Sequence, residues 1–294
     1  NGVIACLNRH TGDIRWKVDT AEVYQAKNIK WGISESVLID NDKVICTPGG
    51  RDATMVALDK MTGSLIWRTQ GFSEKSAYCS PIIAEHNGTN LLITNTEESV
   101  LIVDPDTGEV LCPIPHEKRH DLAAVSPVYY NGLIYVTSGY TREDMPDRSV
   151  AYKLSSDARS FTKAWSERKL DCHHGGVVLL DDCVHGTSAA IYTTASSEKP
   201  LGNWYCLNLN TGQVEYEAKL VGKGSVIYAD GFLYCYGESG ELALVKPGPG
   251  GYEKISSFRI QKGTGEHWAR PAISDGRLYI RHGDSIMVYD ICAQ

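Results

Sequence analysis

One stretch of the chain decides its fold: Ala57-Leu58-Asp59-Lys60-Met61-Thr62-Gly63-Ser64-Leu65-Ile66-Trp67. An apolar strand runs into a polar turn that contains Thr-Gly, and a second strand follows and ends in an aromatic residue. Glycine supplies the positive φ that a tight hairpin turn needs, and Asp and Thr side chains hydrogen-bond the backbone of the turn. The tryptophan is a large apolar plate that we expect to dock between neighbouring units.

The same phrase recurs along the chain, which makes the sequence a repeat. Its Thr-Gly pairs begin at residues 11, 62, 107 and 211, so the spacings are 51, 45 and 104, the last being two periods of 52. A degenerate copy without Thr-Gly fills the double gap, from Val150 to Trp165. The four other copies are Ala5–Trp16, Ala57–Trp67, Ile102–Leu111 and Cys206–Tyr216.

A second phrase precedes each copy: small polar residues, an apolar run, a turn and a β-rich strand. Its turns at residues 131–132, 230–231 and 275–276 are Asn-Gly or Asp-Gly, which are strong hairpin signals. Each repeat therefore holds four short strands in about 45 to 50 residues, the period of a β-propeller blade. No stretch has sustained helical periodicity, and the one short helix that the pattern allows lies near Ala21 to Lys27.

The repeats predict an all-β propeller of four-stranded antiparallel blades over residues 1–294, taken as a single domain. Residues 1–18 hold two strands of an incomplete repeat and residues 267–292 hold three strands of another, which brings the expected total to 25 strands. A six-blade ring would close with one strand to spare; alternatively, the chain is most of a larger ring. The five complete repeats begin near Ser34, Ala77, Ala123, His173 and Gly222.

Composition describes a globular protein: of 294 residues, 42% are hydrophobic and 22% charged. No apolar run approaches the roughly 18 to 20 residues that span a bilayer, so we predict no transmembrane helix. The formal net charge of −7, with basic residues scattered, argues against a nucleic-acid-binding surface. The nine cysteines include no Cys-x-x-Cys pair and most of them lie in apolar runs, which favours buried thiols over zinc or redox sites.

With Leu58–Gly63 and Trp67 in view, the sequence resembles the PQQ-like β-propeller repeat family. Its members include quinoprotein alcohol dehydrogenases and the propeller lipoprotein of the bacterial outer-membrane assembly machine, and the resemblance is to a bacterial envelope subgroup. The stretches that carry it are Trp31–Ser36, Cys46–Gly50, His173–Val178 and Gly222–Val226.

The resemblance implies an eight-blade ring of which this chain supplies most, about six and a half repeats. The chain opens on a strand without a start Met, so we expect N-terminal blades to precede it. A periplasmic, outer-membrane-associated or cell-surface location in a bacterium is implied as well, with a lipid anchor on the missing N-terminal segment.

The family also raises the prospect of PQQ held with Ca²⁺. The quinoprotein dehydrogenases carry an adjacent Cys-Cys pair, a catalytic Asp and oxygen ligands for calcium, whereas this sequence has no adjacent cysteines and no Asp-rich segment. Neither a Gly-x-Ser-x-Gly motif nor a P-loop or His-Glu-x-x-His motif is present. We therefore expect no catalytic residues, no metal and no cofactor, with PQQ and calcium as the alternative.

A candidate binding site comes from the start of each blade, because the first strand of a propeller blade lines the central channel. Aromatic rings there would stack on a polar or anionic ligand and cations would pair with it. The alternative is that these groups satisfy one another around a narrow pore. The candidate channel-mouth residues are Trp31, Glu35, Tyr78, His173, His174, Lys223, Trp268 and Arg270, with Lys75, His120, Asp121, Ser225 and His267 in the same ring.

His173-His174-Gly175-Gly176 is the most pointed feature of this set. Glycines let backbones approach closely, and adjacent histidines in a strand face opposite sides, so we expect only one of the two to point into the channel. A two-His metal site from this pair is therefore not expected.

Together these features predict a non-catalytic envelope propeller that binds a protein partner or a small polar or anionic ligand at the channel mouth. One alternative is a lipoprotein that captures a siderophore or a glycan. The other is a PQQ-dependent oxidoreductase.

Overall fold

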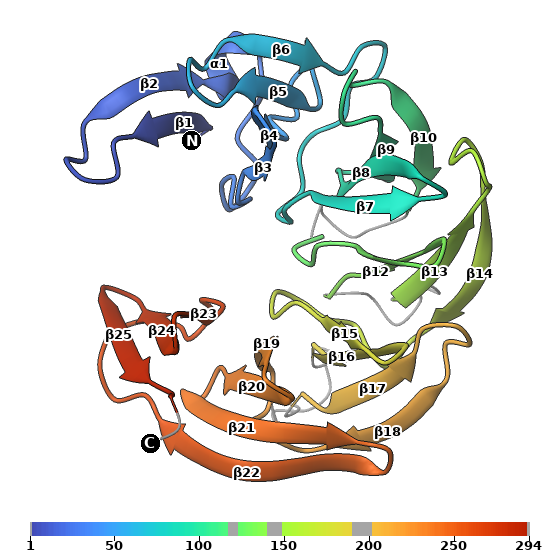
Figure 1. Ribbon diagram of the computed structural model, residues 1–294. Coiled ribbons are helices and arrows are strands. Elements are labelled where there is room, and N and C mark those ends of the chain that lie inside the picture. Colours follow the sequence, from blue (N-terminus) through green and yellow to red (C-terminus); the bar gives the residue numbers. More distant parts are fainter. Residues whose placement is uncertain (1, 117–122, 140–148, 190–201, 293–294) are drawn as a thin grey trace. The chain divides into compact units, whose positions relative to one another are not determined.

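The computed structural model describes residues 2–116, 123–139, 149–189 and 202–292. These residues form 25 β-strands, the number predicted, and one short helix (Figure 1). The helix, α1 (Thr20–Val23), is shorter than the expected Ala21–Lys27 and begins where the Asp19 side chain accepts a hydrogen bond from the N–H of Glu22. Every sheet is an antiparallel meander in which neighbouring strands follow chain order. The all-β prediction is therefore confirmed.

The chain forms two compact units. Unit 1 comprises Asn1–Val136 and Tyr152–Ala164, and unit 2 comprises Thr137–Ala151 and Trp165–Gln294. The prediction of a single domain over residues 1–294 stays a prediction.

Unit 1 begins with a two-stranded sheet, β1 (Val3–Leu7) and β2 (Ile14–Asp19). Two four-stranded sheets follow: β3 (Leu38–Asp40), β4 (Lys43–Cys46), β5 (Val56–Asp59) and β6 (Leu65–Arg68), then β7 (Ile82–His86), β8 (Thr89–Asn95), β9 (Ser99–Val103) and β10 (Val110–Pro115). The next four-stranded sheet has residues in both units: β11 (Val128–Tyr130), β12 (Leu133–Thr137), β13 (Ser149–Leu154) and β14 (Phe161–Glu167).

Unit 2 holds two further four-stranded sheets and one of three strands. The first consists of β15 (Val178–Leu180), β16 (Cys183–Thr187), β17 (Trp204–Asn208) and β18 (Val214–Ala218). The second consists of β19 (Gly224–Ala229), β20 (Phe232–Gly237), β21 (Glu241–Gly248) and β22 (Gly251–Arg259), and the last of β23 (Ala272–Ser274), β24 (Arg277–His282) and β25 (Ser285–Asp290). The predicted five complete repeats and two partial ones thus correspond to the sheets of the described residues.

The Thr-Gly phrase forms the turn between the last two strands of a sheet. Gly12, Gly63, Gly108 and Gly212 have φ values of +78°, +75°, +77° and +74°, which confirms why glycine recurs there. In each turn the glycine N–H donates to the backbone oxygen of the Asn or Asp four residues earlier. In the degenerate copy the residue with the positive φ is Ala158, at +56°.

Three tryptophans join consecutive sheets as plates. The indole N–H groups of Trp16, Trp67 and Trp165 donate to the backbone oxygens of Lys60, Pro105 and Leu209 at 3.1, 2.9 and 2.8 Å. Each acceptor lies three residues before the glycine of a Thr-Gly turn in the following sheet, so every indole covers that glycine. The predicted role of the aromatic residue is therefore confirmed, since the plates fix the spacing between neighbouring sheets.

Apolar side chains fill the space between facing sheets within each unit. In unit 1 the buried residues Cys46, Val56 and Leu58 pack against Ile4 and Trp16 of the first sheet. In unit 2 Leu278 and Ile280 of the last sheet pack against Tyr236 and Leu242. Several cysteines of the chain, such as Cys46, lie in these cores as thiols rather than in disulfides.

Candidate functional site

In unit 1 an exposed aromatic residue stands on a fixed support. Trp31, 59% exposed, lies in the loop before β3, and its ring centroid is 5.8 Å from that of Tyr78 in the loop before β7. The backbone N–H of Trp31 donates to the Tyr78 hydroxyl at 3.3 Å, and the Ser34 hydroxyl donates to the Tyr78 backbone oxygen at 3.0 Å. The Lys30 ammonium lies 4.5 Å from the Trp31 ring centroid. The two predicted residues Trp31 and Tyr78 are thus brought together.

Glu35 lies in the same loop but its carboxylate is turned inward. Oε1 accepts a hydrogen bond from the backbone N–H of Thr47 at 2.6 Å, while Oε2 is buried without a hydrogen-bond partner in the described part of the chain. Burial raises the pKa of Glu35 to about 7, although the hydrogen bond from Thr47 opposes this. A carboxyl with this environment is half protonated near neutral pH and is not a fixed negative charge.

A lysine–glutamate clamp lies nearby in unit 1. The Lys75 ammonium, before β7, is 2.5 Å from Glu97 in the turn between β8 and β9. The backbone N–H of Glu97 in turn donates to the backbone oxygen of Lys75 at 2.9 Å. The clamp ties the segment before β7 to the turn between β8 and β9.

The corresponding place in unit 2 carries a larger polar cluster centred on Glu238, in the turn between β20 and β21. Its Oε1 atom accepts from His174 Nε2 at 2.7 Å and from the Lys223 ammonium at 2.8 Å. Burial acts to raise the pKa of Glu238, but the hydrogen bonds from His174 and Lys223 outweigh it and lower the pKa to about 2. Glu238 is therefore ionised at neutral pH.

His173 joins the same cluster. The Lys223 ammonium donates to its Nδ1 atom at 3.1 Å, and the two histidine rings are 5.0 Å apart. Burial and the nearby Lys223 charge lower the pKa of His173 to about 3, so this imidazole is neutral. The cluster of His173, Lys223 and Glu238 therefore carries no net charge at neutral pH.

The expectation that His173 and His174 face opposite sides is wrong. Both precede β15 in a loop and are not part of a strand, and both rings turn toward the Lys223–Glu238 pair. Gly176, with a φ of +72°, supplies the backbone turn that takes the pair out of the alternating geometry of a strand.

The two glycines that follow the histidines allow close approach, as predicted. A Cβ atom on Gly175 would collide with the backbone of Gly224, and one on Gly176 would lie 2.8 Å from a guanidinium nitrogen of Arg270. Arg270 Nε donates to the Val226 backbone oxygen at 3.1 Å. Trp268, 53% exposed, lies in the same loop as Arg270, with its ring 5.5 Å from that of His174.

Sequence reasoning missed Glu238. The signal that would have found it is the acidic residue in the turn after the second strand, because Glu97 occupies that turn in unit 1 and clamps a lysine in the same way. The backbone N–H of Glu238 donates to the Lys223 oxygen at 2.8 Å, which repeats the arrangement of Glu97 and Lys75.

The remaining predicted residues have separate surroundings. His267 Nδ1 is hydrogen-bonded to the Tyr236 hydroxyl and its ring stacks on that of His282, with centroids 3.6 Å apart. The Ser225 hydroxyl is buried and has no hydrogen-bond partner among the described residues. His120 and Asp121 lie outside the described residues.

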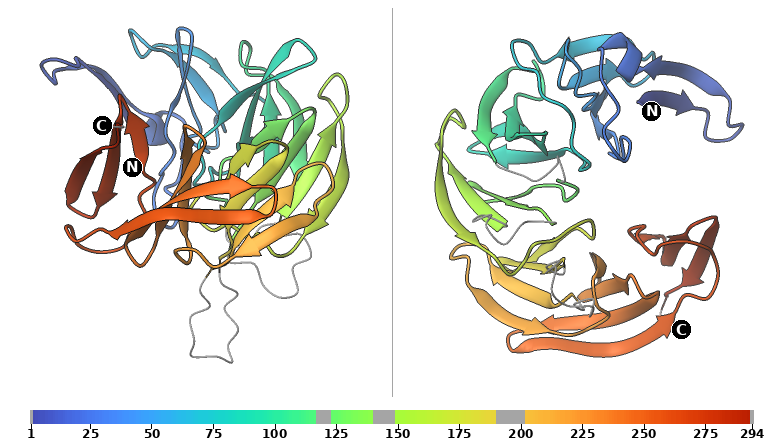
Figure 2. Two further views of the ribbon diagram at one scale, coloured as in Figure 1. Left: turned by 60° about the horizontal axis from the view of Figure 1, so that its bottom comes forward. Right: turned by 180° about the vertical axis from the view of Figure 1, so that it is seen from behind.

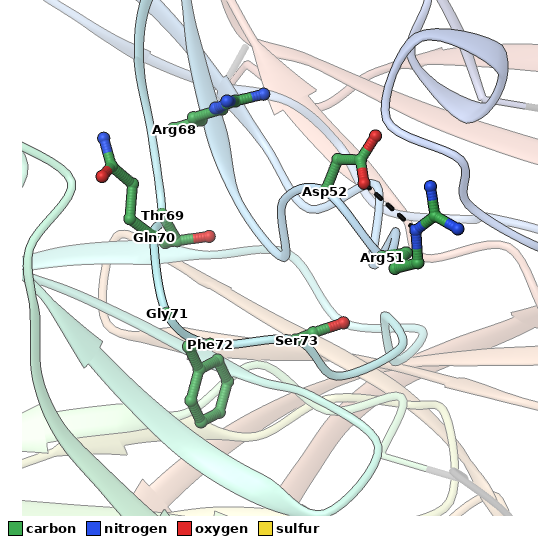
Figure 3. Close-up of a pocket in the computed structure, with 8 residues that line it drawn as sticks. All are labelled: Arg51, Asp52, Arg68, Thr69, Gln70, Gly71, Phe72 and Ser73. Atoms are coloured by element: carbon green, nitrogen blue, oxygen red, sulfur yellow. Dashed lines mark hydrogen bonds and ion pairs between the residues drawn. The ribbon is translucent and has the colours of Figure 1, made fainter.

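A polar pocket of about 440 Å³ lies elsewhere in unit 1 (Figure 3). Arg68 at the end of β6 and residues 69–73 after it form one wall, and Arg51 and Asp52 form the other. Arg51 Nε lies 3.2 Å from an Asp52 oxygen, while the Gln70 and Phe72 side chains point away from that pair. None of the predicted site residues lines this pocket.

Comparison with known proteins adds the family. Residues 1–217 match the family described as the outer membrane protein assembly factor BamB. The chain belongs to this family. The predicted resemblance to PQQ-like propellers is therefore confirmed. No curated protein shows significant sequence similarity to the chain.

Solved structures similar to this BamB-family chain include a BamB protein, an alcohol dehydrogenase and a designed protein. BamB from Moraxella catarrhalis has a TM-score of 0.63 at 17% identity, over 98% of this chain and 76% of that one. The quinohemoprotein alcohol dehydrogenase from Comamonas testosteroni has a TM-score of 0.62 at 13% identity, over 96% of this chain and 60% of that one. The computationally designed Ika8 protein has a TM-score of 0.63 at 12% identity, over 99% and 78% of the two chains. At these identities the likeness shows the fold, a β-propeller, and not the activity.

Two further findings concern the described residues alone. They contain no group of three or more His, Cys, Asp and Glu side chains placed to hold a metal ion. None of their helices is long and apolar enough to cross a membrane.

Proposed function

We propose that this BamB-family chain is a non-catalytic β-propeller protein of the bacterial cell envelope that binds a protein partner through the loops before the first strands of its sheets. The family match supports a partner-binding role and an envelope location, periplasmic or outer-membrane-associated. The proposal includes the eight-blade ring, of which the sheets described here would form most. A lipid anchor belongs to the same proposal.

The observation that carries the proposal is the pair of exposed tryptophans on rigid supports, Trp31 in unit 1 and Trp268 in unit 2. In the free protein an exposed tryptophan ring is in contact with water. A partner that covers the ring removes a large apolar area from water at little conformational cost. Tyr78 fixes Trp31, and the ring of His174, held by Glu238, lies against Trp268. Such preordered aromatic residues are typical of the energetic centres of protein interfaces.

Charge favours a protein partner over a small anionic ligand such as a siderophore. In the unit 2 cluster the Lys223 ammonium is already paired with Glu238, and His173 is neutral. An anion would have to displace Glu238 to gain the full Lys223 charge, and a half-buried carboxylate left without its partners is costly. Arg270 is the cation of this group that forms no ion pair within the described residues.

Photo-crosslinking tests the proposal. A benzophenone amino acid placed at residue 31 or 268 of the protein should form crosslinks in envelope preparations to the same partner from both positions. The variants Trp31→Ala and Trp268→Ala should lower recovery of that partner at least tenfold. Met61→Ala in unit 1 and Ile255→Ala in unit 2, which also truncate exposed apolar side chains, should leave recovery unchanged.

Two other results would contradict partner binding through the loops of Trp31 and Trp268. Equal recovery with the tryptophan and control variants would show that these loops do not bind the partner. Alcohol oxidation by the purified protein after addition of PQQ and Ca²⁺ would favour the oxidoreductase. The described residues do not offer the cluster of ligands that calcium prefers, so we derive no step through that cofactor.

A further inference from the structure

The polar pocket of unit 1 has an excess of positive charge. Its volume of about 440 Å³ lies in the range of small-molecule sites. Arg51 and Arg68 line it, and Asp52 is the acidic residue of the lining, so two positive charges accompany one negative charge. The whole chain has a formal net charge of −7, so this pocket differs in sign from the protein around it. Such a local excess of positive charge attracts anions.

The carboxylate of the pocket is already paired, whereas most of the cationic groups are not. One Asp52 oxygen accepts from Arg51 Nε at 3.2 Å, and the other accepts from the side-chain amide of Gln25 at 3.0 Å. The two terminal nitrogens of Arg51 and the Arg68 guanidinium form no hydrogen bond or ion pair within the described residues. In Figure 3 the Arg68 side chain extends toward the side of the pocket where Asp52 lies. Both arginines can therefore donate to a ligand.

The wall formed by residues 69–73 is held in one conformation. The Thr69 hydroxyl accepts a hydrogen bond from the backbone N–H of Thr54 at 3.0 Å, and the Thr54 hydroxyl donates to the Phe72 backbone oxygen at 3.3 Å. The Ser73 hydroxyl donates to the Gly50 backbone oxygen at 3.3 Å, which ties this wall to the segment that carries Arg51. A ligand would thus meet a preformed surface and would spend little of its binding energy on ordering the loop.

The same wall offers backbone donors to the pocket. The side chains of Gln70 and Phe72 point away from the Arg51–Asp52 pair (Figure 3), and a Cβ atom on Gly71 would meet nothing within 4 Å. The backbone N–H groups of residues 70–73 donate no hydrogen bond within the described part of the chain. Guanidinium groups and free backbone N–H groups are the donors that bind carboxylate and phosphate oxygens in proteins.

We infer that this pocket binds the carboxylate or phosphate group of a small polar ligand, with Arg68 and Arg51 as its cationic donors. The unit 2 cluster differs in the decisive respect, because there the Lys223 ammonium is paired with Glu238. Here an incoming anion displaces no carboxylate. The inference does not depend on the proposed function, since none of the residues that carry that proposal lines the pocket.

NMR titration of the full chain tests the inference with three sugars of similar size. D-glucuronate carries a carboxylate, glucose 6-phosphate carries a phosphate, and glucose is neutral. At least one of the two anions should shift the amide resonances of residues 70–73 in a saturable way, more weakly as salt is added, and glucose should not. The anion that binds more tightly identifies the group that the pocket prefers. Equal shifts with glucose, or no shift with either anion, would overturn the inference.

A matched pair of arginine variants locates the cationic donor. Arg68→Gln should weaken binding of the preferred anion roughly tenfold or more, because a charged hydrogen-bond donor is lost. Arg15→Gln removes an exposed arginine of β2 that does not line the pocket, and it should leave the affinity unchanged. Equal affinity of the two variants would show that the anion binds without Arg68 and would overturn the assignment.

A second pair keeps the test decisive if Arg68→Gln does not fold. Gly71 has a φ of +68°, which Asp and Asn tolerate better than most residues, and its Cβ position is open. Gly71→Asp adds a negative charge to the wall and should abolish anion binding, whereas Gly71→Asn has nearly the same shape and should retain it. Equal binding by these two variants would contradict an anion site at this wall.

Discussion

One buried oxygen atom of Glu35 makes the stability of the folded protein depend on pH. Its Oε1 is satisfied by Thr47 but its Oε2 has no partner within the described residues, so the ionised form is poorly solvated. The folded protein therefore holds a proton that the unfolded chain releases at lower pH. A group with a raised pKa in the folded state contributes stability below its unfolded pKa and loses that contribution as pH rises through the folded value.

This predicts a stability loss between pH 4.5 and about 7, the ordinary and the folded pKa of Glu35. The free energy of unfolding should fall by about 3 kcal/mol across this window, at 1.36 kcal/mol per pKa unit. Glu35→Gln, which keeps an acceptor for Thr47 without a charge, should remove this part of the pH dependence and be more stable than the wild type at pH 8. Urea unfolding at pH 5 and 8 measures both; Glu98→Gln, in an exposed turn of unit 1, is the control.

Single residues also mark the limit of what the sequence reveals. The Thr-Gly, Asn-Gly and Asp-Gly turns depend on residues within one hairpin, so they could be predicted, and Asn131 and Gly132 do have positive φ. The contact of His174 with Glu238 joins residues 64 positions apart in the chain, and neither lies in a strand at that point. Such a pair depends on how two loops meet, which no local pattern encodes.

At the scale of elements, the loop before β23 is held by a histidine. His282, at the end of β24, places Nδ1 2.8 Å from the Lys262 oxygen and Nε2 2.9 Å from the Gly265 oxygen. Because carbonyl oxygens only accept hydrogen bonds, the ring can donate both bonds at once only in its doubly protonated form, the imidazolium. These two bonds raise the pKa of His282, and the Asp284 carboxylate acts in the same direction.

His267, whose ring stacks on that of His282, has a pKa shifted in the opposite direction. Burial, then the charge of His282 and that of Arg259, lower the pKa of His267, while Glu266 opposes the shift. The Tyr236 hydroxyl is hydrogen-bonded to His267 Nδ1. Two histidine rings whose pKa values are shifted in opposite directions thus stack on each other, and the loop of residues 262–265 is tied to β24 through His282.

We predict that the tie is present below pH 6.5, the ordinary value for histidine, and is lost as pH rises through the raised pKa of His282. NMR titration should give His282 a midpoint above 6.5 and His267 one below it. His282→Gln should weaken protection of the 262–265 amides at pH 6, because glutamine cannot replace both N–H donors of the ring. His10→Gln, at an exposed turn, should leave this protection unchanged. A His282 midpoint below that of His267 would contradict the assignment.

At the scale of the whole chain, each sheet is stabilised by the sheets next to it in sequence. The three tryptophan plates, and the apolar clusters around them, join consecutive sheets only. Stability of such a repeat is close to a sum of nearest-neighbour interfaces, as in other repeat proteins. The periodicity of 45 to 52 residues was therefore enough to predict the strand count, whereas the number of blades in a closed ring depends on geometry that one repeat does not specify.

The variant Trp67→Ala tests whether the stability of the chain is a sum of nearest-neighbour interfaces. The indole is 6% exposed, lies between the sheet of β3–β6 and that of β7–β10, and contributes a hydrogen bond as well as apolar area. Its loss should cost about 3 to 5 kcal/mol at that interface. Amide exchange should accelerate in β5, β6, β9 and β10 and stay unchanged in β19–β22 of unit 2. Trp31→Ala, which removes an exposed indole from the same unit, should change neither set, and acceleration in every sheet alike would mean that the chain unfolds as one cooperative body.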